Sequence, residues 1–288
     1  MIKILDGKKI AEEMRVELRL EISEMKKEGV VPGLAVILAG KSAASQIYVR
    51  NKERACESLG IFSEVHRLDE DVKEAEILAL IAKLNADEKI HGILVQLPLP
   101  AHLDPQKIIS AISPKKDVDC FHPENVGRMF LGEPIFLPCT PAGIMEMLKR
   151  YEIEISGKNV VIVGRSNIVG KPLAVMMLKE NATVTIAHSK TKNLAVVAKQ
   201  ADILVAAVGR AGLITADMIK QGAVVVDVGI NRGEDGKLAG DVDFEKVSEV
   251  AGAITPVPGG VGPMTIAMLM KNTVAAAKMF YEIRKYGN

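Results

Sequence analysis

The sequence predicts two α/β domains, each built around a parallel β-sheet. Three observations lead to this fold class. The chain of 288 residues is long enough for two domains of ordinary size. Strand-like and helix-like patterns alternate in both halves of the chain, which is typical of parallel sheets with helical crossovers. Residues 160–172, VVIVGRSNIVGKP, form an apolar run, a glycine turn and the start of a helical pattern.

The first half reads as a helix followed by a βαβαβ unit. Asp6 can cap a helix that Gly29 and Pro32 end. Its apolar residues recur at three- and four-residue spacing, namely Ile10, Met14, Leu18, Ile22 and Met25. Apolar or alternating runs predict strands at 34–39, 61–68 and 92–96, with helices at 42–59 and 72–84.

The second half repeats this alternation. Strands are expected at 160–163, 183–187, 203–206 and 224–228, with helices between them. The charged, glycine-bearing segment 231–237 predicts a hairpin turn. A last helix at 265–285 is expected to return to the first domain, and residues 138–150 form the other link. The expected domains are therefore 1–145 plus 265–288, and 146–264, joined by two long helices with a cleft between them.

Composition excludes several classes of function. A net charge of +1 gives no electrostatic reason to expect nucleic-acid binding, and the chain has no tryptophan for base stacking. No apolar stretch is long enough to span a membrane, and MIKILDGKK lacks signal-peptide features, so we expect a cytoplasmic protein. Cys120 and His122 are close in sequence, but no second ligand pair follows at zinc spacing. We therefore expect no metal, and reduced thiols.

The glycine turn at residues 164–170 indicates a dinucleotide site. A strand, a tight turn and a helix N-terminus present backbone N–H groups to a phosphate, although Gly164, Ser166 and Gly170 depart from the usual G-x-G-x-x-G spacing. A strand–turn–helix without a ligand also fits the motif. Arg165 adds a positive charge, and Ser189 follows the next strand where NAD-binding proteins carry a carboxylate. These two positions favour NADP over NAD.

Two residues in the first half form a candidate catalytic pair. Tyr48 and Lys52 are four apart, so on a helix they project from the same face. Partial burial lowers the pKa of a lysine toward neutrality, which suits acid–base chemistry. Gln96 ends an expected strand and could hydrogen-bond Lys52 or a substrate. Taken alone, the same residues also fit an amphipathic helix with a solvated lysine and an ordinary polar strand end.

Two further segments carry candidate ligand-binding residues. Asp117 and Asp119 follow a proline, and a carboxylate there can accept two parallel hydrogen bonds from an N–H and an adjacent amino group, as a pterin presents. A solvated loop aspartate fits the sequence equally well. The segment PVPGGVGPMT, residues 256–265, predicts a rigid loop or a close approach of backbone to a ligand.

These segments together carry a family resemblance. In chain order they are YVRNK, GILVQLPLP, PKKDVDCFHPENVGR, VVIVGRSNIVGKP, AHSKT and PVPGGVGPMT. The set resembles the bifunctional methylenetetrahydrofolate dehydrogenase/methenyltetrahydrofolate cyclohydrolase family over essentially the whole chain. The resemblance implies NADP-dependent oxidation of 5,10-methylenetetrahydrofolate to 5,10-methenyltetrahydrofolate, its hydrolysis to 10-formyltetrahydrofolate, and a homodimer. Residues 1–145 plus 265–288 would then form the folate-binding catalytic domain, and 146–264 a Rossmann-like NADP-binding domain.

The resemblance also implies roles for individual residues. Lys52 is the key catalytic residue, supported by Tyr48 and Gln96. Asp119 anchors the pterin, and Tyr48 also contacts the substrate. The positions that match NADP contacts are Gly164, Arg165, Ser166, Ser189 and Ile230. The positions that match a loop beside the folate are Pro258, Gly259 and Gly260.

Two other functions fit parts of the sequence. Another two-domain dehydrogenase, acting on a shikimate- or amino-acid-like substrate, would account for the second half but gives no reason for Lys52, Gln96 and Asp119 to occur together. A non-catalytic dinucleotide sensor would bind the cofactor without turnover and would not require the Tyr48–Lys52 pair.

Overall fold

The protein is described by a computed structural model that covers residues 2–233 and 236–287. The chain divides into two compact units. The three-stranded unit comprises Glu13–Cys139 and the chain from Ile266 onward, and the six-stranded unit comprises the residues up to Glu12 together with Thr140–Thr265. Each unit therefore combines a continuous central segment with a piece from one end of the chain.

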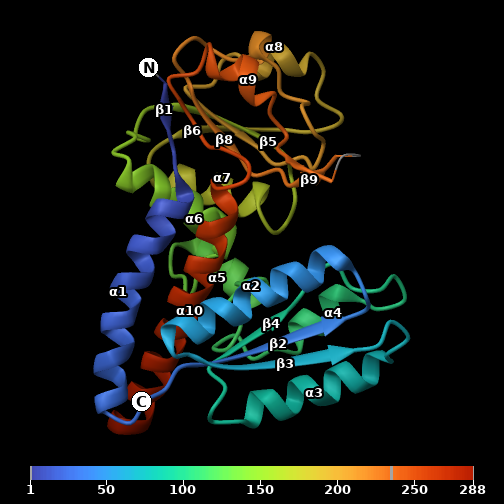
Figure 1. Cartoon of the computed structure of the whole chain (residues 1–288), viewed down its shortest axis with the longest axis vertical. Coiled ribbons are helices and arrows are strands. Elements are labelled where there is room, and N and C mark those ends of the chain that lie inside the picture. Colours follow the sequence, from blue (N-terminus) through green and yellow to red (C-terminus); the bar gives the residue numbers. More distant parts are fainter. Residues whose placement is uncertain (1, 234–235, 288) are drawn as a thin grey trace. The chain divides into compact units, whose positions relative to one another are not determined.

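The three-stranded unit is the expected βαβαβ fold. Its parallel strands lie in the order β3-β2-β4, with bounds β2 Gly33–Ala39, β3 Phe62–Leu68 and β4 Gly92–Val95. Helix α2 (Ala43–Leu59) joins β2 to β3, and α3 (Glu74–Ala86) joins β3 to β4. The second crossover runs back across β2, so right-handed connections place α2 and α3 on opposite faces, as Figure 1 shows. All seven residues of β2 are buried as a result.

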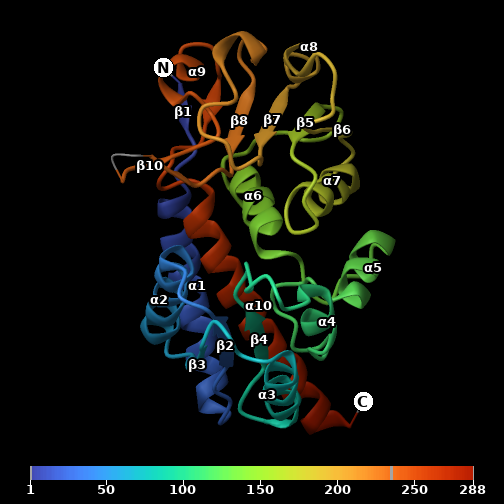
Figure 2. The ribbon, with the colours of Figure 1, turned by 90° about the vertical axis from the view of Figure 1, so that its right-hand side faces the viewer.

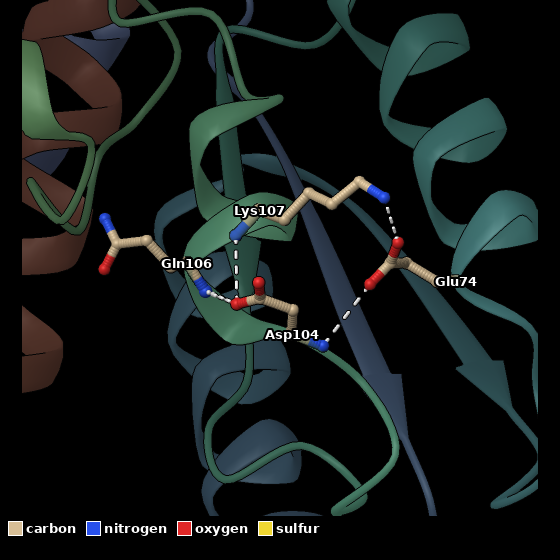
Figure 3. Close-up of polar contacts among 4 residues, drawn as sticks. All are labelled: Glu74, Asp104, Gln106 and Lys107. Carbon is tan, nitrogen blue, oxygen red and sulfur yellow. Dashed lines mark hydrogen bonds and ion pairs between the residues drawn. The ribbon is translucent and has the colours of Figure 1, made fainter.

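Two short helices complete this unit, and both begin at a proline. They are α4 (Pro105–Ser110) and α5 (Pro123–Leu131). The Asp104 carboxylate caps α4 by accepting hydrogen bonds from the backbone N–H groups of Gln106 at 2.9 Å and Lys107 at 3.3 Å. Lys107 also forms an ion pair with Glu74 at the start of α3 (Figure 3). This exposed network fixes α4 beside α3 and carries no catalytic groups.

Long helices near both ends of the chain pass from one unit to the other. Helix α1 (Gly7–Lys27) begins after Asp6, whose carboxylate accepts a hydrogen bond from Lys9 N–H at 2.9 Å, as the capping pattern predicted. The five apolar residues expected to face the core are all buried, at Ile10, Met14, Leu18, Ile22 and Met25. Helix α10 (Val261–Tyr286) starts four residues earlier than expected, since Pro263 in the first turn needs no intrahelical N–H bond.

The six-stranded unit contains a parallel sheet in the order β1-β11-β8-β7-β5-β6. Its strands are β1 Lys3–Ile4, β5 Asn159–Val163, β6 Thr183–Ala187, β7 Ile203–Ala206, β8 Val224–Asp227 and β11 Ala253–Ile254. Its helices are α6 Cys139–Arg150, α7 Gly170–Lys179, α8 Leu194–Ala198 and α9 Phe244–Ser248, with a 3₁₀ turn, η1, at Ala216–Met218. Figure 2 shows β8, β7, β5 and β6 in this order, with α7 and α8 on opposite sides of the strands.

The direction of strand addition reverses at β5. Strand β6 lies on one side of β5, and the next strand in the chain, β7, lies on the other. In open α/β sheets, ligands bind at the carboxyl ends of the strands at such a reversal. This places the expected dinucleotide turn, which follows β5, at the point in the sheet where a ligand is expected.

The structure differs from the expected bounds at the N-terminus. Residues up to Glu12 group with the six-stranded unit, because β1 pairs with β11 through Lys3 and Ile4. The sequence signal for β1 is only two residues long. The helices that connect the two units also differ from the expectation. Helices α1 and α10 each contain residues of both units, whereas α6, expected as a connecting helix around 138–150, begins at the boundary between Cys139 and Thr140.

The expected hairpin at 231–237 forms between β9 (Asn231–Arg232) and β10 (Leu238–Ala239), which pair antiparallel. Residues 234 and 235 of its turn lie outside the described residues.

Among the residues that the structure describes, no helix is both long and apolar enough to cross a membrane. The same part of the chain brings no three His, Cys, Asp or Glu side chains together as a metal site. Cys120 and His122 make separate contacts: the Cys120 thiol donates to Phe136 C=O at 3.2 Å, and His122 Nδ1 accepts from Glu124 N–H at 3.1 Å.

Candidate functional site

A buried lysine forms the centre of the candidate site in the three-stranded unit. Lys52 lies on α2, which Ser42 caps at its start and which Gly60, at φ 68°, ends. The Lys52 side chain is 7% exposed, and its ammonium donates a hydrogen bond to Gln96 Oε1 at 3.0 Å. Gln96 directly follows β4, so the carboxyl end of a strand supplies the partner of a helix residue. The structure therefore brings together two residues that are 44 positions apart.

The amide of Gln96 is held in one orientation. Its Nε2 donates to Leu97 C=O at 2.8 Å, which leaves Oε1 facing Lys52. A lysine that is hydrogen-bonded to a neutral acceptor can be present as the ammonium or as the amine. An amide oxygen carries no negative charge, so it stabilises the ammonium less than a carboxylate would. Gln96 thus positions the nitrogen without fixing its protonation state.

Opposing effects act on the proton of Lys52. Burial lowers the pKa of Lys52, while the negative charge of Asp119 raises it. The amine form is therefore accessible closer to neutral pH than for an exposed lysine, which is the property required of a general base. Tyr48 lies one turn earlier on the same helix and is half-buried, and burial raises the pKa of its phenol. Tyr48 accordingly stays protonated at neutral pH and can donate a hydrogen bond.

Asp119 lies in a turn that a second aspartate holds. Asp117 is 1% exposed, and its carboxylate accepts hydrogen bonds from Phe121 N–H at 3.2 Å, His122 N–H at 2.8 Å and Asn125 Nδ2 at 2.8 Å. The two aspartates therefore have different roles. The Asp117 carboxylate accepts hydrogen bonds from backbone and amide donors, whereas Asp119 is partly exposed and its negative charge raises the pKa of Lys52. The residue types and spacing did not separate these roles, whereas the family resemblance assigned the ligand contact to Asp119.

Two residues of this site were not identified from the sequence. The buried thiol of Cys139 donates to Val118 C=O at 3.4 Å, and burial, together with the charge of Asp119, raises its pKa well above the ordinary value. Asn272, on α10, donates to Val118 C=O at 2.8 Å, to Leu137 C=O at 2.9 Å and toward Cys139 Sγ at 3.6 Å. Asn272 thereby ties the residue before Asp119 to the segment that carries Cys139. These contacts span more than 130 positions of sequence, so no local pattern could indicate them.

The glycine turn of the six-stranded unit has the close backbone packing of a dinucleotide turn. Gly164 has φ 140°, and a Cβ there would lie 2.3 Å from Ala207 O. A Cβ on Gly170 would lie 2.2 Å from Gly164 O, so the start of α7 approaches the end of β5 too closely for any side chain. The altered glycine spacing therefore preserves the close approach that such turns require. These residues fit a dinucleotide cofactor.

The polar residues of this turn divide into a structural and an exposed group. Ser166 Oγ accepts from Val169 N–H at 3.1 Å and Gly170 N–H at 3.4 Å, so this hydroxyl caps the start of α7. Arg165 and Ser189 are exposed after β5 and β6, which are neighbouring parallel strands, so both residues lie at the carboxyl edge of the sheet. Ile230, 44% exposed, follows β8 and carries an apolar side chain at the same edge of the sheet.

The loop at 256–260 approaches α1 closely. Gly259 O accepts a hydrogen bond from Lys8 N–H at 2.9 Å, and a Cβ on Gly7 would lie 1.9 Å from Gly260 O. Pro258 follows a cis peptide bond in the same loop. Pro258, Gly259 and Gly260 all belong to the six-stranded unit, whereas Lys52, Gln96 and Asp119 belong to the three-stranded unit.

Comparison with known sequences decides the family. The model of the tetrahydrofolate dehydrogenase/cyclohydrolase catalytic domain matches residues 5–119, and that of the NAD(P)-binding domain of the same family matches residues 138–281. The chain belongs to the tetrahydrofolate dehydrogenase/cyclohydrolase family. This confirms the resemblance inferred from the six segments, and it decides against another class of two-domain dehydrogenase.

Individual relatives agree over nearly the whole chain. The chain is 62% identical to the bifunctional protein FolD of Moorella thermoacetica over 276 residues, which cover 96% of this chain and 99% of that protein. The structure is similar to that of the bifunctional enzyme FolD from Campylobacter jejuni, with a TM-score of 0.95, 52% identity, and 97% and 99% of the two chains covered. It is also similar to the Trypanosoma brucei enzyme complexed with NADP cofactor and inhibitor, with a TM-score of 0.93, 40% identity, and 96% and 98% covered.

Proposed function

We propose that the chain oxidises 5,10-methylenetetrahydrofolate with NADP and hydrolyses the resulting 5,10-methenyltetrahydrofolate to 10-formyltetrahydrofolate. The observation that carries this assignment is the buried Lys52, whose pKa is lowered by burial and whose nitrogen is held by Gln96, in a chain of this family. A lysine in this state can accept a proton near neutral pH, and the hydrolytic reaction requires such a group.

Hydrolysis is the step that needs Lys52. Water forms a bond to the methenyl carbon while the Lys52 amine takes a proton from that water. The ammonium then returns this proton to N5 as the bond between N5 and the carbon breaks. The hydroxyl of the adduct releases its own proton to solvent as its C–O bond becomes the C=O of the formyl group on N10. Gln96 holds the Lys52 nitrogen through both transfers, and Tyr48 donates a hydrogen bond from the same helix face. Asp119 binds the pterin N–H and amino group, and its charge keeps the ammonium form accessible.

Oxidation needs alignment more than acid–base chemistry, because both ring nitrogens share the positive charge that develops on the carbon. When bound, NADP would supply the acceptor for the hydride. The residues that would hold NADP are Gly164, Arg165, Ser166, Ser189 and Ile230. In this assignment Arg165 and Ser189 bind the 2′-phosphate, the Ser166 hydroxyl holds the turn that faces the pyrophosphate, and Ile230 provides an apolar contact. Pro258, Gly259 and Gly260 form a loop beside the folate.

The proposal includes a homodimer. Strand β6 is the outer strand of its sheet, and both Thr185 and Ile186 are exposed on it. An edge strand of this kind can pair with the same strand of a second copy. Light scattering after size-exclusion chromatography measures the mass directly, and a monomer at micromolar concentration would contradict this part. The cytoplasmic location, and the cleft expected between the two domains, stay predictions.

A coupled assay with wild type and two variants tests the assignment. NADPH and the methenyl chromophore are followed together after addition of methylenetetrahydrofolate and NADP. Lys52→Met should abolish hydrolysis of the methenyl compound, because no other group replaces the amine. Arg50→Met changes an exposed cation on the same helix and should retain wild-type hydrolysis. Full hydrolysis by Lys52→Met would remove Lys52 from the mechanism, and no reaction of the wild type with either folate would refute the assigned function.

A further inference from the structure

A buried carboxylate occupies an anion-binding turn of the six-stranded unit. Asp241 is 0% exposed. It accepts hydrogen bonds from three consecutive backbone N–H groups, those of Val208 at 2.6 Å, Gly209 at 3.0 Å and Arg210 at 2.8 Å. Asn231 Nδ2 donates to the same carboxylate at 2.9 Å. Successive N–H groups that converge in this way form a backbone anion-binding site, or cup, and in this chain the Asp241 carboxylate occupies it.

A second aspartate fixes the backbone of the first. Asp227, 3% exposed, accepts from the N–H groups of Gly229 and Asp241 at 2.9 Å and Val242 at 3.0 Å. Burial raises the pKa of Asp227 to about 6, and the charge of Asp241 acts in the same direction. Glycine is required on both sides: a Cβ on Gly229 would lie 2.3 Å from Asp241 Oδ1, and one on Gly240 would lie 1.8 Å from Asp227 Oδ2.

These contacts join two loops that border the dinucleotide turn. Residues 207–210 follow β7, and a Cβ on Gly164 would lie 2.3 Å from Ala207 O. Ile230 lies between Gly229, which abuts Asp241, and Asn231, which donates to it. The Asp241 carboxylate therefore connects the loop that contacts the glycine turn with the loop that carries Ile230.

We propose that Asp241 is a positioning residue of the dinucleotide site, where its charge holds the loops 207–210 and 229–231 in the conformation that binds the cofactor. This inference rests on the proposed function of the six-stranded unit. A carboxylate is needed because both of its oxygens accept hydrogen bonds, Oδ2 from Val208 and Gly209 and Oδ1 from Arg210 and Asn231, so four N–H donors face it. An asparagine would turn its NH₂ toward one of them, or leave donors without an acceptor.

The first test measures NADP affinity and folate hydrolysis separately. Isothermal calorimetry gives the dissociation constant of NADP for the wild type, Asp241→Asn and the control Asp243→Asn, whose partner Lys246 is exposed. Asp241→Asn should weaken NADP binding by about 10-fold or more, since a charge-assisted hydrogen bond contributes at least that factor. Hydrolysis of methenyltetrahydrofolate, which uses Lys52 in the other unit and no redox step, should stay within about twofold for both variants.

The second test restores the missing anion. In Asp241→Ala the backbone cup lacks its carboxylate, and added sodium formate should recover NADP affinity with saturation. Sodium chloride at the same ionic strength should not, and the wild type should not respond to formate. A purely structural loss of packing would not respond to a small carboxylate.

Three outcomes overturn the inference. They are wild-type NADP affinity in Asp241→Asn, loss of hydrolysis together with NADP binding in that variant, and absence of formate rescue in Asp241→Ala. If the wild type itself binds no NADP, the proposed function fails and the inference fails with it, so the two failures are distinguishable.

Discussion

His91 should make the stability of the three-stranded unit depend on pH in a calculable way. The ring is 8% exposed, and Nδ1 accepts a hydrogen bond from Gly33 N–H at 3.1 Å. Its edge packs against Phe280 of α10, with ring centroids 5.9 Å apart and planes at 72°. Burial and, next, the positive charge of Lys116 lower its pKa from 6.5 to about 4, although Asp87 acts in the opposite direction. Between these two pH values His91 is therefore largely neutral in the folded protein and largely protonated in the unfolded chain.

The magnitude follows from this difference between the folded and unfolded states. A histidine whose pKa is lower in the folded state contributes stability that is fully present above the unfolded pKa and is lost as the pH falls toward the folded pKa. One pKa unit corresponds to about 1.4 kcal/mol. For a shift from 6.5 to about 4, integration between pH 7 and pH 5 gives a loss of about 2 kcal/mol. Near pH 4 the loss approaches about 3 kcal/mol.

Asparagine at position 91 provides the comparison. Its Oδ1 lies where Nδ1 lies in histidine, so it can accept the hydrogen bond from Gly33 N–H without titrating. Urea unfolding of wild type and His91→Asn at pH 7 and pH 5 gives four free energies of unfolding. The wild type should lose about 2 kcal/mol more than the variant over this interval. Other titrating groups, including Asp227, whose raised pKa acts in the opposite direction, are common to both proteins and cancel.

A control variant shows that the effect belongs to His91. Gln106→Asn, at an exposed and uncharged position, keeps His91 and should lose the same free energy of unfolding as the wild type over this interval. If His91→Asn and the wild type lost the same free energy between pH 7 and pH 5, the reasoning from burial of His91 would be refuted.

Arg165→Ala should weaken NADP binding about 10- to 150-fold more than NAD binding, because only the 2′-phosphate forms a charge-assisted hydrogen bond with the guanidinium. Calorimetry with both cofactors measures this, Lys179→Ala on the exposed end of α7 is the control, and equal losses would contradict the role of Arg165. Gly170→Ala places a Cβ 2.2 Å from Gly164 O, so the turn must shift and NADP affinity should fall while hydrolysis of methenyltetrahydrofolate persists. Unchanged NADP affinity in Gly170→Ala would show that the close approach is not needed for binding.

The sequence predicted the elements whose signal is local. Four strands of the six-stranded unit lie within one residue of their expected bounds, because runs such as Val160–Val163 are buried on both faces. Strands β1 and β11 were missed because each has two residues and forms only through pairing with a partner far away in sequence. Helices α4 and α5 were missed although Asp104 and His122 stand in the capping position before a proline.

The candidate site divides in the same way. The spacing of Tyr48 and Lys52 indicated a shared helix face, and Gln96 was indicated by its place after a strand. Whether Gln96 bonds Lys52 or a substrate was open from the sequence, and the structure shows the bond to Lys52. The roles of Cys139 and Asn272 depend on contacts between distant segments, and no periodicity in either segment contains that information. Local patterns thus identified residues that lie at the carboxyl edge of the sheet. They did not identify the residues, such as Cys139 and Asn272, that hold those side chains in place.

Comparison of Lys52 with another buried lysine shows why burial alone does not identify a catalytic base. Lys116 is 3% exposed, and burial lowers its pKa as well. Its ammonium, however, donates to Leu84 C=O at 3.0 Å and Asp87 C=O at 2.8 Å at the end of α3 and lies over the ring of Phe280. These carbonyl acceptors at a helix C-terminus and the face of the Phe280 ring all favour the positively charged ammonium over the neutral amine.

Lys52 differs in what its neighbours require. The Gln96 amide oxygen also accepts from the ammonium, but that amide is anchored independently through Leu97 C=O and keeps its place when the proton leaves. Asp119 lies close enough to favour the ammonium, and burial favours the amine, so the balance between the two forms is set by groups that do not themselves depend on the proton. A lysine can exchange a proton with a substrate only when its surroundings tolerate both states, and in this chain that condition distinguishes Lys52 from Lys116.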